Sequence, residues 1–149
     1  MFTIRKATLD EALTARLIEL SELWAAEGCT HGLIPNGPED LKEPLWIALD
    51  GETVVGYIFG HFYTAENRTS YIEPGSRCFD VDELYVLPER RSEGIGKALY
   101  EALREGVRDQ AEYVTLATAT KDWRRILRFY TEEVGMDFHN AFLIQKVSE

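Results

Sequence analysis

Two neighbouring segments of the sequence hold residue types that could carry out chemistry. The first, Cys78–Val86, reads as a strand that contains three carboxylates, Asp80, Asp82 and Glu83. Asp and Glu are poor strand formers, so this pattern indicates that at least one carboxylate faces a substrate instead of lying on a solvated strand. The second segment, Leu84–Leu99, runs from that strand through a basic loop with two glycines into an apolar helix.

The loop between this strand and this helix has the features of an anion site. A helix N-terminus presents unpaired N–H groups and the positive end of a dipole. Arg90, Arg91 and Lys97 add full positive charges. Gly94 and Gly96 would let a phosphate approach the backbone closely.

Two well-known phosphate-binding loops are excluded. The Walker pattern GxxxxGK[ST] fails because Ala98 follows Lys97 and because Arg91 stands where the first glycine is needed. The GxGxxG pattern fails because Leu99 stands at the position of its third glycine. A bare GxG at a helix start is often structural, so these residues alone leave anion binding and a structural turn equally open.

In its setting, the loop resembles the acetyl-CoA pyrophosphate loop of the GNAT family of N-acetyltransferases. Residues 91–96 read RSEGIG, which matches R/Q-x-x-G-x-G/A, and they follow a strand that ends in V-x-P. Later in the chain, Arg128–Tyr130 followed by Val134–Met136 is similar to the family's late helix pattern, xxFYxxxGF. The order of predicted elements also looks like that of the family over most of the chain.

The resemblance implies the contacts of the co-substrate acetyl-CoA. The loop would hold the pyrophosphate through backbone amides, with the Arg91 side chain beside it. The strand end would pair with the pantetheine arm, and one amide there would polarise the thioester carbonyl. The implied strand residues are Leu84, Tyr85 and Val86, and the implied loop residues are Arg91, Ser92, Glu93, Gly94, Ile95, Gly96 and Lys97.

The resemblance also implies catalytic roles. Tyr130 matches the tyrosine that protonates the departing thiolate, although its place on an apolar stripe would also suit a core tyrosine. Asp82 matches the carboxylate that assists amine deprotonation, and Glu83 is the second candidate. Regular alternation puts Asp80 and Asp82 on one face and Glu83 on the other, unless the bulge that is usual for this strand in the family intervenes.

The ordinary pKa values of the reacting groups limit these catalytic roles. A lysine-like amine has a pKa near 10.4, so about one molecule in 10³ is neutral at pH 7, a cost of roughly 4.6 kcal/mol. Asp82 would therefore need burial that raises its pKa, would act through a chain of waters, or would only hold the ammonium. A tyrosine near pKa 10 protonates a thiolate near 8.5 at a cost of about 2 kcal/mol, which is feasible.

Two positions depart from the family pattern. Trp123 stands where the family often has an asparagine that helps to bind CoA, and Ser92 replaces a common glycine. Cys29 and Cys78 are expected to be small packing residues. The first loop, Gly28–Leu41, contains His31, which could contact the acceptor, although a surface histidine is favoured. Acidic residues flank this loop and could form a rim for a cationic acceptor, although a solvated face is favoured; they are Glu27, Glu39, Asp40 and Glu43.

The length and composition of the chain exclude several classes of protein. The chain has 149 residues, which favours a single domain over residues 1–149, and its charge balance is 16 − 26 = −10. That charge argues against nucleic acid or an anionic membrane as the main partner. Two cysteines and three scattered histidines predict no metal site. No apolar run is long enough for a membrane helix and no signal peptide is apparent, so a cytoplasmic setting is expected.

The patterns predict a mixed α/β domain. The expected strands are 2–7, 44–49, 54–63, 78–86, 113–117 and 142–147, and the expected helices follow Asp10, span 94–110 and run from Asp122 to Gly135. Residues 79–117 should form a right-handed parallel crossover. The resemblance implies a mostly antiparallel twisted sheet of six to seven strands, about four flanking helices and a V-shaped splay between the fourth and fifth strands.

These inferences lead to one predicted activity with two alternatives. We expect an acetyl-CoA-dependent N-acetyltransferase that passes the acetyl group directly to a primary amine, with acidic character favouring a small cationic amine. The alternatives are a protein or peptide N-acetyltransferase and a non-catalytic acyl-CoA-binding module. Members of the family are often dimers, so a homodimer is possible.

Overall fold

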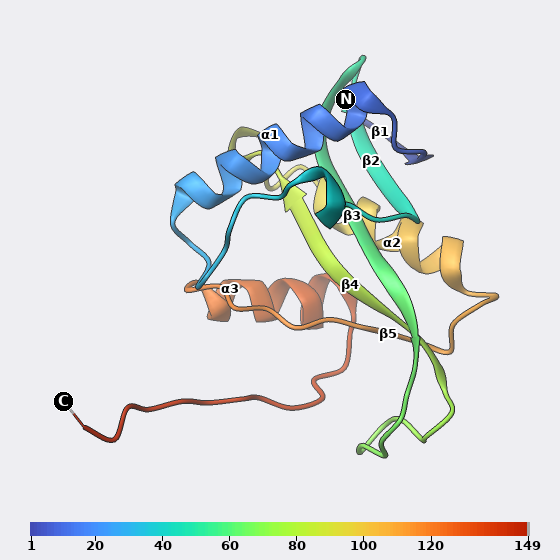
Figure 1. Ribbon diagram of the computed structural model, residues 1–149, viewed down its shortest axis with the longest axis vertical. Coiled ribbons are helices and arrows are strands. Elements are labelled where there is room, and N and C mark those ends of the chain that lie inside the picture. Colours follow the sequence, from blue (N-terminus) through green and yellow to red (C-terminus); the bar gives the residue numbers. More distant parts are fainter. Residues whose placement is uncertain (149) are drawn as a thin grey trace.

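The computed structural model describes residues 1–148, and its elements follow the predicted order (Figure 1). Its strands and α-helices are β1 (Thr3–Ala7), α1 (Glu11–Glu27), β2 (Leu45–Asp50), β3 (Thr53–Thr64), β4 (Arg77–Val86), α2 (Ile95–Val107), β5 (Tyr113–Thr115) and α3 (Trp123–Arg128). Two 3-10 turns, η1 (Pro38–Asp40) and η2 (Pro88–Arg90), and a π-helical segment, η3 (Phe129–Val134), complete them. Among the described residues, no helix is both long and apolar enough to span a membrane.

The sheet has five strands in the order β1-β2-β3-β4-β5. The first four pair antiparallel, as the hairpin signal at Asp50-Gly51 predicts for β2 and β3. β4 and β5 pair in parallel and are joined through α2, so the predicted parallel crossover is confirmed. The sheet is therefore mixed but mostly antiparallel.

The two faces of the sheet are covered by different helices, α1 on one and α2 on the other (Figure 1). On the α1 face, Trp24 stacks on Tyr85 with ring centroids 5.1 Å apart, and Tyr57 and Phe59 lie beside them in the core. On the α2 face, Leu99 is completely buried. This packing of helices on both faces of the sheet positions β4 and the α2 N-terminus, where the predicted site lies.

Helix starts follow the capping signals only in part. Asp10 caps α1 as its pattern predicts, since its carboxylate accepts a hydrogen bond of 2.7 Å from the Leu13 N–H. Asp122 stands at the start of α3, but its side chain caps nothing. It instead accepts a 2.6 Å hydrogen bond from Arg125 Nε.

The predicted count of strands and helices is wrong for the described residues. They form five strands and three α-helices, not six to seven strands and about four helices. The missing strand is Phe142–Val147, whose extended backbone has no ladder partner. A strand exists only through pairing, so an apolar pattern without a neighbouring strand leaves the segment outside the sheet.

Candidate active site

The loop between β4 and α2 offers a run of free backbone amides. The N–H groups from Ser92 to Lys97 have no hydrogen-bond acceptor within residues 1–148, whereas the flanking N–H groups of Arg91 and Ala98 bond to Pro88 and Gly94 carbonyls. Ser92 and Gly94 have positive φ angles of 67° and 88°. Left-handed residues of this kind are typical of the turns whose successive amides bind anions. This loop at the N-terminus of α2 is suited to a diphosphate.

The arginines of the loop are already paired. Arg90 donates hydrogen bonds to Asp50 at 2.6 Å and to both oxygens of Glu93 at 3.0 and 3.1 Å. The hydrogen bond from Arg90 lowers the pKa of Glu93. Because the positive charge of Arg90 is compensated, and Lys97 Nζ lies 3.8 Å from a Glu101 carboxylate oxygen, the anion affinity of the loop rests mainly on its amides and on the dipole of α2.

Arg91 connects the loop to the end of α1. Its two Nη atoms lie 2.9 and 3.0 Å from the carboxylate oxygens of Glu27, and its Nε donates to the Val86 carbonyl at 2.9 Å. Its guanidinium carbon is 5.5 Å from the centre of the Tyr85 ring. Glu27 also accepts a 2.9 Å hydrogen bond from the Tyr85 hydroxyl. Glu27, predicted to belong to a solvated acidic rim, is thus part of this network.

Gly96 has a packing role beside the predicted phosphate role. A Cβ added at Gly96 would lie 3.3 Å from Cζ of Phe129, so a side chain there would require the Phe129 ring to shift slightly. This contact brings η3, which carries Tyr130, against the first turn of α2.

β4 and β5 separate where the resemblance predicts a splay. Their pairing runs from Cys78 opposite Tyr113 to Asp80 opposite Thr115 and then ends. Thr115 Oγ1 holds this vertex, since it donates to Asp80 at 2.7 Å and lies 3.1 Å from the Tyr63 hydroxyl. Leu84–Val86 lie beyond the vertex and pair with β3 alone, so their edge toward β5 is open to an extended ligand.

A β-bulge in β4 decides which way the carboxylates face. Phe59 pairs with Glu83 and Gly60 pairs with Val81, so Asp82 is an extra residue on β4. Regular alternation is therefore interrupted, and Glu83 joins Asp80 on the α1 face instead of opposing it. Gly60 permits the bulge, because a Cβ there would collide with the Asp80 carbonyl oxygen and the Phe79 ring.

Glu83 is held in a protected environment. Its Oε1 accepts hydrogen bonds from the Tyr57 hydroxyl at 2.7 Å and from Asn36 Nδ2 at 2.9 Å. Burial raises the pKa of Glu83, and the two donated hydrogen bonds lower it in part. Asn36 comes from the first loop and Tyr57 from β3, and neither forms a recognisable motif with Glu83 in the sequence.

Asp82 has a different environment. It lies 3.0 Å from Lys42 Nζ and 3.0 Å from His61 Nδ1. His61, Asp80 and Asp82 together offer three ligand atoms within 4.8 Å of one another, which is close enough to hold a metal ion. The expectation that the protein has no metal site therefore stays a prediction, because one of the histidines that are scattered in the sequence, His61, meets two carboxylates in space.

Tyr130 lies half-buried in η3 with its ring 5.0 Å from that of Phe129. Burial, with a smaller contribution from the nearby Tyr100, raises the pKa of Tyr130 to about 12. Its hydroxyl has no hydrogen-bond partner in the part of the chain that the structure describes. The hydroxyl is therefore protonated at neutral pH and free to donate.

The remaining predicted candidates lie apart from this cluster or are structural. Cys78 is fully buried and Cys29 half-buried, so both pack as expected. Asp40 and Glu43 accept hydrogen bonds from the backbone N–H groups of Gly37 and Leu9. His31 and Glu39 have exposed side chains. Trp123, which replaces the family's asparagine, is 48% exposed.

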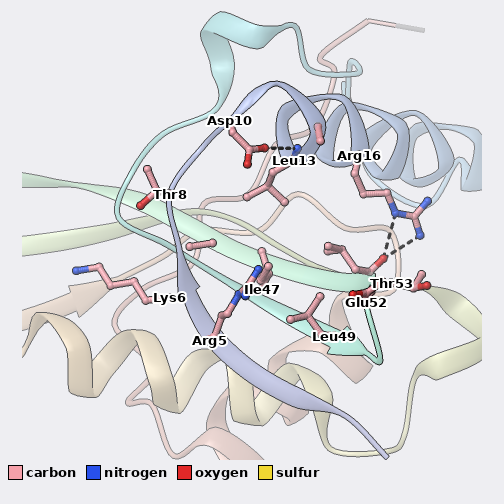
Figure 2. Close-up of a pocket in the computed structure, with 13 residues that line it drawn as sticks. Arg5, Lys6, Thr8, Asp10, Leu13, Arg16, Ile47, Leu49, Glu52 and Thr53 are labelled. Carbon is pink, nitrogen blue, oxygen red and sulfur yellow. Dashed lines mark hydrogen bonds between the residues drawn. The ribbon is translucent and has the colours of Figure 1, made fainter.

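A groove of about 550 Å³ lies between β1, the first turns of α1 and the β2–β3 hairpin (Figure 2). Arg16 closes one side of it by donating through Nε and Nη2 to the Val54 carbonyl at 3.1 and 2.8 Å. The groove shares no residue with β4, with the loop or with η3. It is thus separate from the candidate active site.

Splayed parallel strands that lead into an amide-lined helix start define an α/β domain suited to a phosphorylated, extended ligand. A family model described as "Acetyltransferase (GNAT) family" matches residues 11–136. The chain therefore belongs to the GNAT acetyltransferase family, and it is an acyltransferase that uses acetyl-CoA as co-substrate. No curated protein matches the chain significantly in sequence.

Solved structures share this fold at low sequence identity. An acetyltransferase from Trypanosoma brucei is 18% identical with a TM-score of 0.67, over 99% of this chain and 100% of that one. A predicted acetyltransferase from Clostridium acetobutylicum, solved with acetyl-CoA, is 17% identical with a TM-score of 0.67, over 99% and 97%. An aminoglycoside acetyltransferase from an uncultured soil metagenomic sample, solved with sisomicin, is 18% identical with a TM-score of 0.62, over 97% and 96%.

Proposed function

We propose that this enzyme transfers the acetyl group of acetyl-CoA directly to the primary amine of a small cationic acceptor, with Glu83 as the general base and Tyr130 as the general acid. The observation that carries the proposal is the environment of Glu83. A carboxylate whose pKa is raised by burial, and which two donors hold in place, is a better proton acceptor than an ordinary exposed one.

The chain's own residues provide each part of the reaction. The amides of Ser92–Lys97 bind the diphosphate, and Leu84–Val86 align the pantetheine arm along the open edge of β4. Glu83, directly or through a water, takes the proton of the acceptor ammonium. The amine nitrogen then bonds to the acetyl carbon, the carbon–sulfur bond breaks, and the leaving thiolate takes the Tyr130 proton. The nitrogen gives up its second proton as the amide forms, and this proton returns through water to the Tyr130 oxygen, while Glu83 releases the first proton to solvent.

Tyr130 is suited to act late in this sequence. A pKa of about 12 lies well above that of an ordinary thiol, near 8.5, so its proton stays on oxygen until the sulfur carries most of the negative charge. Until then the hydroxyl stabilises the developing thiolate by a hydrogen bond.

The cationic character of the acceptor is supported by the charges beside Glu83. Asp80 and Asp82 lie on the same strand as Glu83, and Asp82 pairs with the Lys42 ammonium at 3.0 Å, the type of group that a cationic acceptor would present. The net charge of −10 acts in the same direction over longer distances. One structural neighbour is an aminoglycoside acetyltransferase solved with sisomicin.

The function is tested in two stages. Acetyl-CoA at about 100 times its Kd should stabilise the protein by about 2.7 kcal/mol and raise Tm by roughly 5–11 °C. Release of free thiol with a panel of diamines, polyamines and aminoglycosides should then identify the acceptor. No shift in Tm at millimolar acetyl-CoA would contradict the proposal.

Substitution of Tyr130 separates an enzyme from a non-catalytic binding module. Tyr130→Phe should lower kcat about 10²-fold or more while the Tm shift with acetyl-CoA persists, because the ring still packs on Phe129. Tyr71→Phe, at an exposed tyrosine outside the site, is the matched control and should leave kcat unchanged. Thiol release that is absent from both the wild type and the Tyr130 variant would favour the module.

A further inference from the structure

Lys42 places a primary amine on a carboxylate of β4. It stands between η1 and β2, and its Nζ lies 3.0 Å from Oδ2 of Asp82. The side chain of Lys42 is nevertheless 47% exposed. An ion pair that is open to solvent is weak, because water and salt screen it. The Lys42 amine is therefore positioned at this strand but can leave the pair.

The backbone on the N-terminal side of Lys42 is held over the candidate active site. Leu41, its neighbour, is buried in the main core. Earlier in the same loop, Asn36 donates a 2.9 Å hydrogen bond from Nδ2 to Glu83, and its backbone N–H donates one of 2.9 Å to Ser21 Oγ. The flexible part is the four-carbon stem of the lysine. The loop thus presents a flexible amine beside the proposed general base.

The amine also lies near the proposed path of the acetyl group. Asp82 directly precedes Glu83 and stands two residues before Leu84, where the open edge for the pantetheine arm begins. A strand rises about 3.3 Å per residue, so about 7 Å of strand separates Asp82 from that edge. In residues 1–148, no other lysine pairs with a carboxylate of β4.

We infer that the enzyme acetylates its own Lys42, whose amine occupies the acceptor position while no external amine is bound. The inference rests on the proposed function, because it uses the same base, acid and co-substrate site. It adds a second, internal substrate and assigns Lys42 as a site of covalent modification.

The step has the same chemistry as transfer to an external amine. Glu83 takes a proton from the Lys42 ammonium, directly or through a water. The neutral Nζ then bonds to the acetyl carbon, the carbon–sulfur bond breaks, and the thiolate of CoA takes the Tyr130 proton. The second proton of the nitrogen returns through water to the Tyr130 oxygen, and Glu83 releases the first to solvent. The products are N-acetylated Lys42 and free CoA.

Acetylation of Lys42 should change how the enzyme binds other acceptors. An amide carries no positive charge, so acetylated Lys42 cannot pair with Asp82. That carboxylate retains His61 at 3.0 Å and can receive the ammonium group of an external acceptor. The modified enzyme should therefore have a several-fold lower KM for a cationic amine than the unmodified enzyme, with little change in kcat.

The test incubates the full chain with acetyl-CoA and no added amine, and follows each lysine by peptide mass spectrometry. We expect one acetyl group on Lys42, added at a rate that is independent of protein concentration. Because Lys42 is positioned, this rate should exceed that of Lys6, an exposed lysine of β1 outside the site, at least about 10-fold.

Two variants provide the controls. Glu83→Gln should slow the labelling of Lys42 about 10²-fold and leave that of Lys6 unchanged, with the circular dichroism spectrum of the wild type. Lys42→Arg keeps a positive charge for Asp82 without an acceptor amine, and should show only the slow background labelling of the other lysines.

Four outcomes would overturn the inference. Equal labelling of Lys42 and Lys6, or labelling of Lys42 that persists in Glu83→Gln, would mean that acetyl-CoA reacts with the lysine without catalysis. A rate that rises in proportion to protein concentration would mean that one molecule acetylates another. An unlabelled Lys42 in an enzyme that releases thiol with a polyamine would exclude self-acetylation and leave the proposed function in place. No labelling and no thiol release with any amine of the panel would contradict both.

Discussion

Glu83 and Asp82 are neighbours in the chain, yet their surroundings favour different roles. Glu83 is half-buried, and its two hydrogen-bond donors are neutral, so its charge is unpaired. Burial raises its pKa. Asp82 is already paired with Lys42 and His61. An unpaired carboxylate of raised pKa is suited to accept a proton, whereas a paired one is suited to hold a cation. The structure thus favours Glu83 as the proton acceptor, whereas the sequence had ranked Asp82 first for that role.

Replacing each carboxylate by its amide tests this difference. Glu83→Gln should lower kcat/KM about 10²- to 10³-fold, because it removes the base but can still accept from Tyr57 and Asn36. Asp82→Asn should mainly raise KM for the acceptor and change kcat little. Steady-state kinetics with thiol detection measures both variants. A larger loss of kcat in Asp82→Asn would assign the base to Asp82.

The pH profile should report on Glu83 directly. The base must be ionised, so activity should fall as pH falls through its pKa, which burial places above the ordinary 4.5. The Tyr57 hydroxyl favours the ionised form by donating to it. Tyr57→Phe should therefore move the acidic limb of kcat/KM to higher pH and leave the plateau in place. Tyr71→Phe should not move that limb, and an unmoved limb in Tyr57→Phe would mean that another group controls it.

The β4–α2 loop and α1 are linked by a single carboxylate. Glu27, in the last turn of α1, pairs with both Nη atoms of Arg91 and accepts from the Tyr85 hydroxyl, which lies in β4. Helix, strand and loop therefore meet at one partly buried charge. Such a contact restrains the loop that is proposed to bind the diphosphate.

Removing this carboxylate should cost stability. Glu27→Ala is expected to destabilise the fold by about 1–2 kcal/mol, since it leaves Arg91 unpaired at a partly buried site. Tm should fall by roughly 2–8 °C. Glu105→Ala is the matched control, because Glu105 pairs with Arg108 on the exposed face of α2 and should change stability by less than about 0.5 kcal/mol. Equal Tm values for the two variants in thermal melts would contradict this role for Glu27.

The molecule as a whole carries an excess of negative charge. With 16 basic and 26 acidic residues, it attracts cationic acceptors and repels anions such as acetyl-CoA. The amide-lined loop offsets that repulsion locally, because dipoles bind an anion without adding net charge. The acceptor and the co-substrate should therefore respond to salt in opposite directions.

Ionic strength provides the measurement. For an acceptor with several ammonium groups, kcat/KM should fall several-fold when salt rises from about 0.05 to 0.5 M, because the added ions shorten the reach of the acidic field. A monoamine of similar size should show a smaller decrease, and KM for acetyl-CoA should not rise. If the monoamine and the polyamine respond equally, the net charge does not select the acceptor.

Much of the fold and of the co-substrate loop could be predicted from the sequence because local rules encode them. Hydrophobic periodicity placed the main helices and strands, Asp10 marked the start of α1, and Asp50-Gly51 marked a hairpin. The segment RSEGIG after V-x-P predicted the loop. The diphosphate contact proposed for this loop depends on backbone amides, which a short local motif can position. Family membership followed from these short motifs, and the family match over residues 11–136 agrees with it.

The tertiary structure decided what depends on partners distant in the chain. The bulge that turns Glu83 toward the α1 face requires Gly60 on the facing strand. Burial raises the pKa of Glu83, and hydrogen bonds from Tyr57 and Asn36 oppose that rise in part. The pairing of Arg91 with Glu27 joins residues 64 positions apart. Phe142–Val147 has the pattern of a strand, but pairing needs a neighbouring strand that its own sheet does not bring to it. Patterns along the chain thus determined which elements could form, and contacts between distant segments determined which of them paired and which carboxylate has a raised pKa.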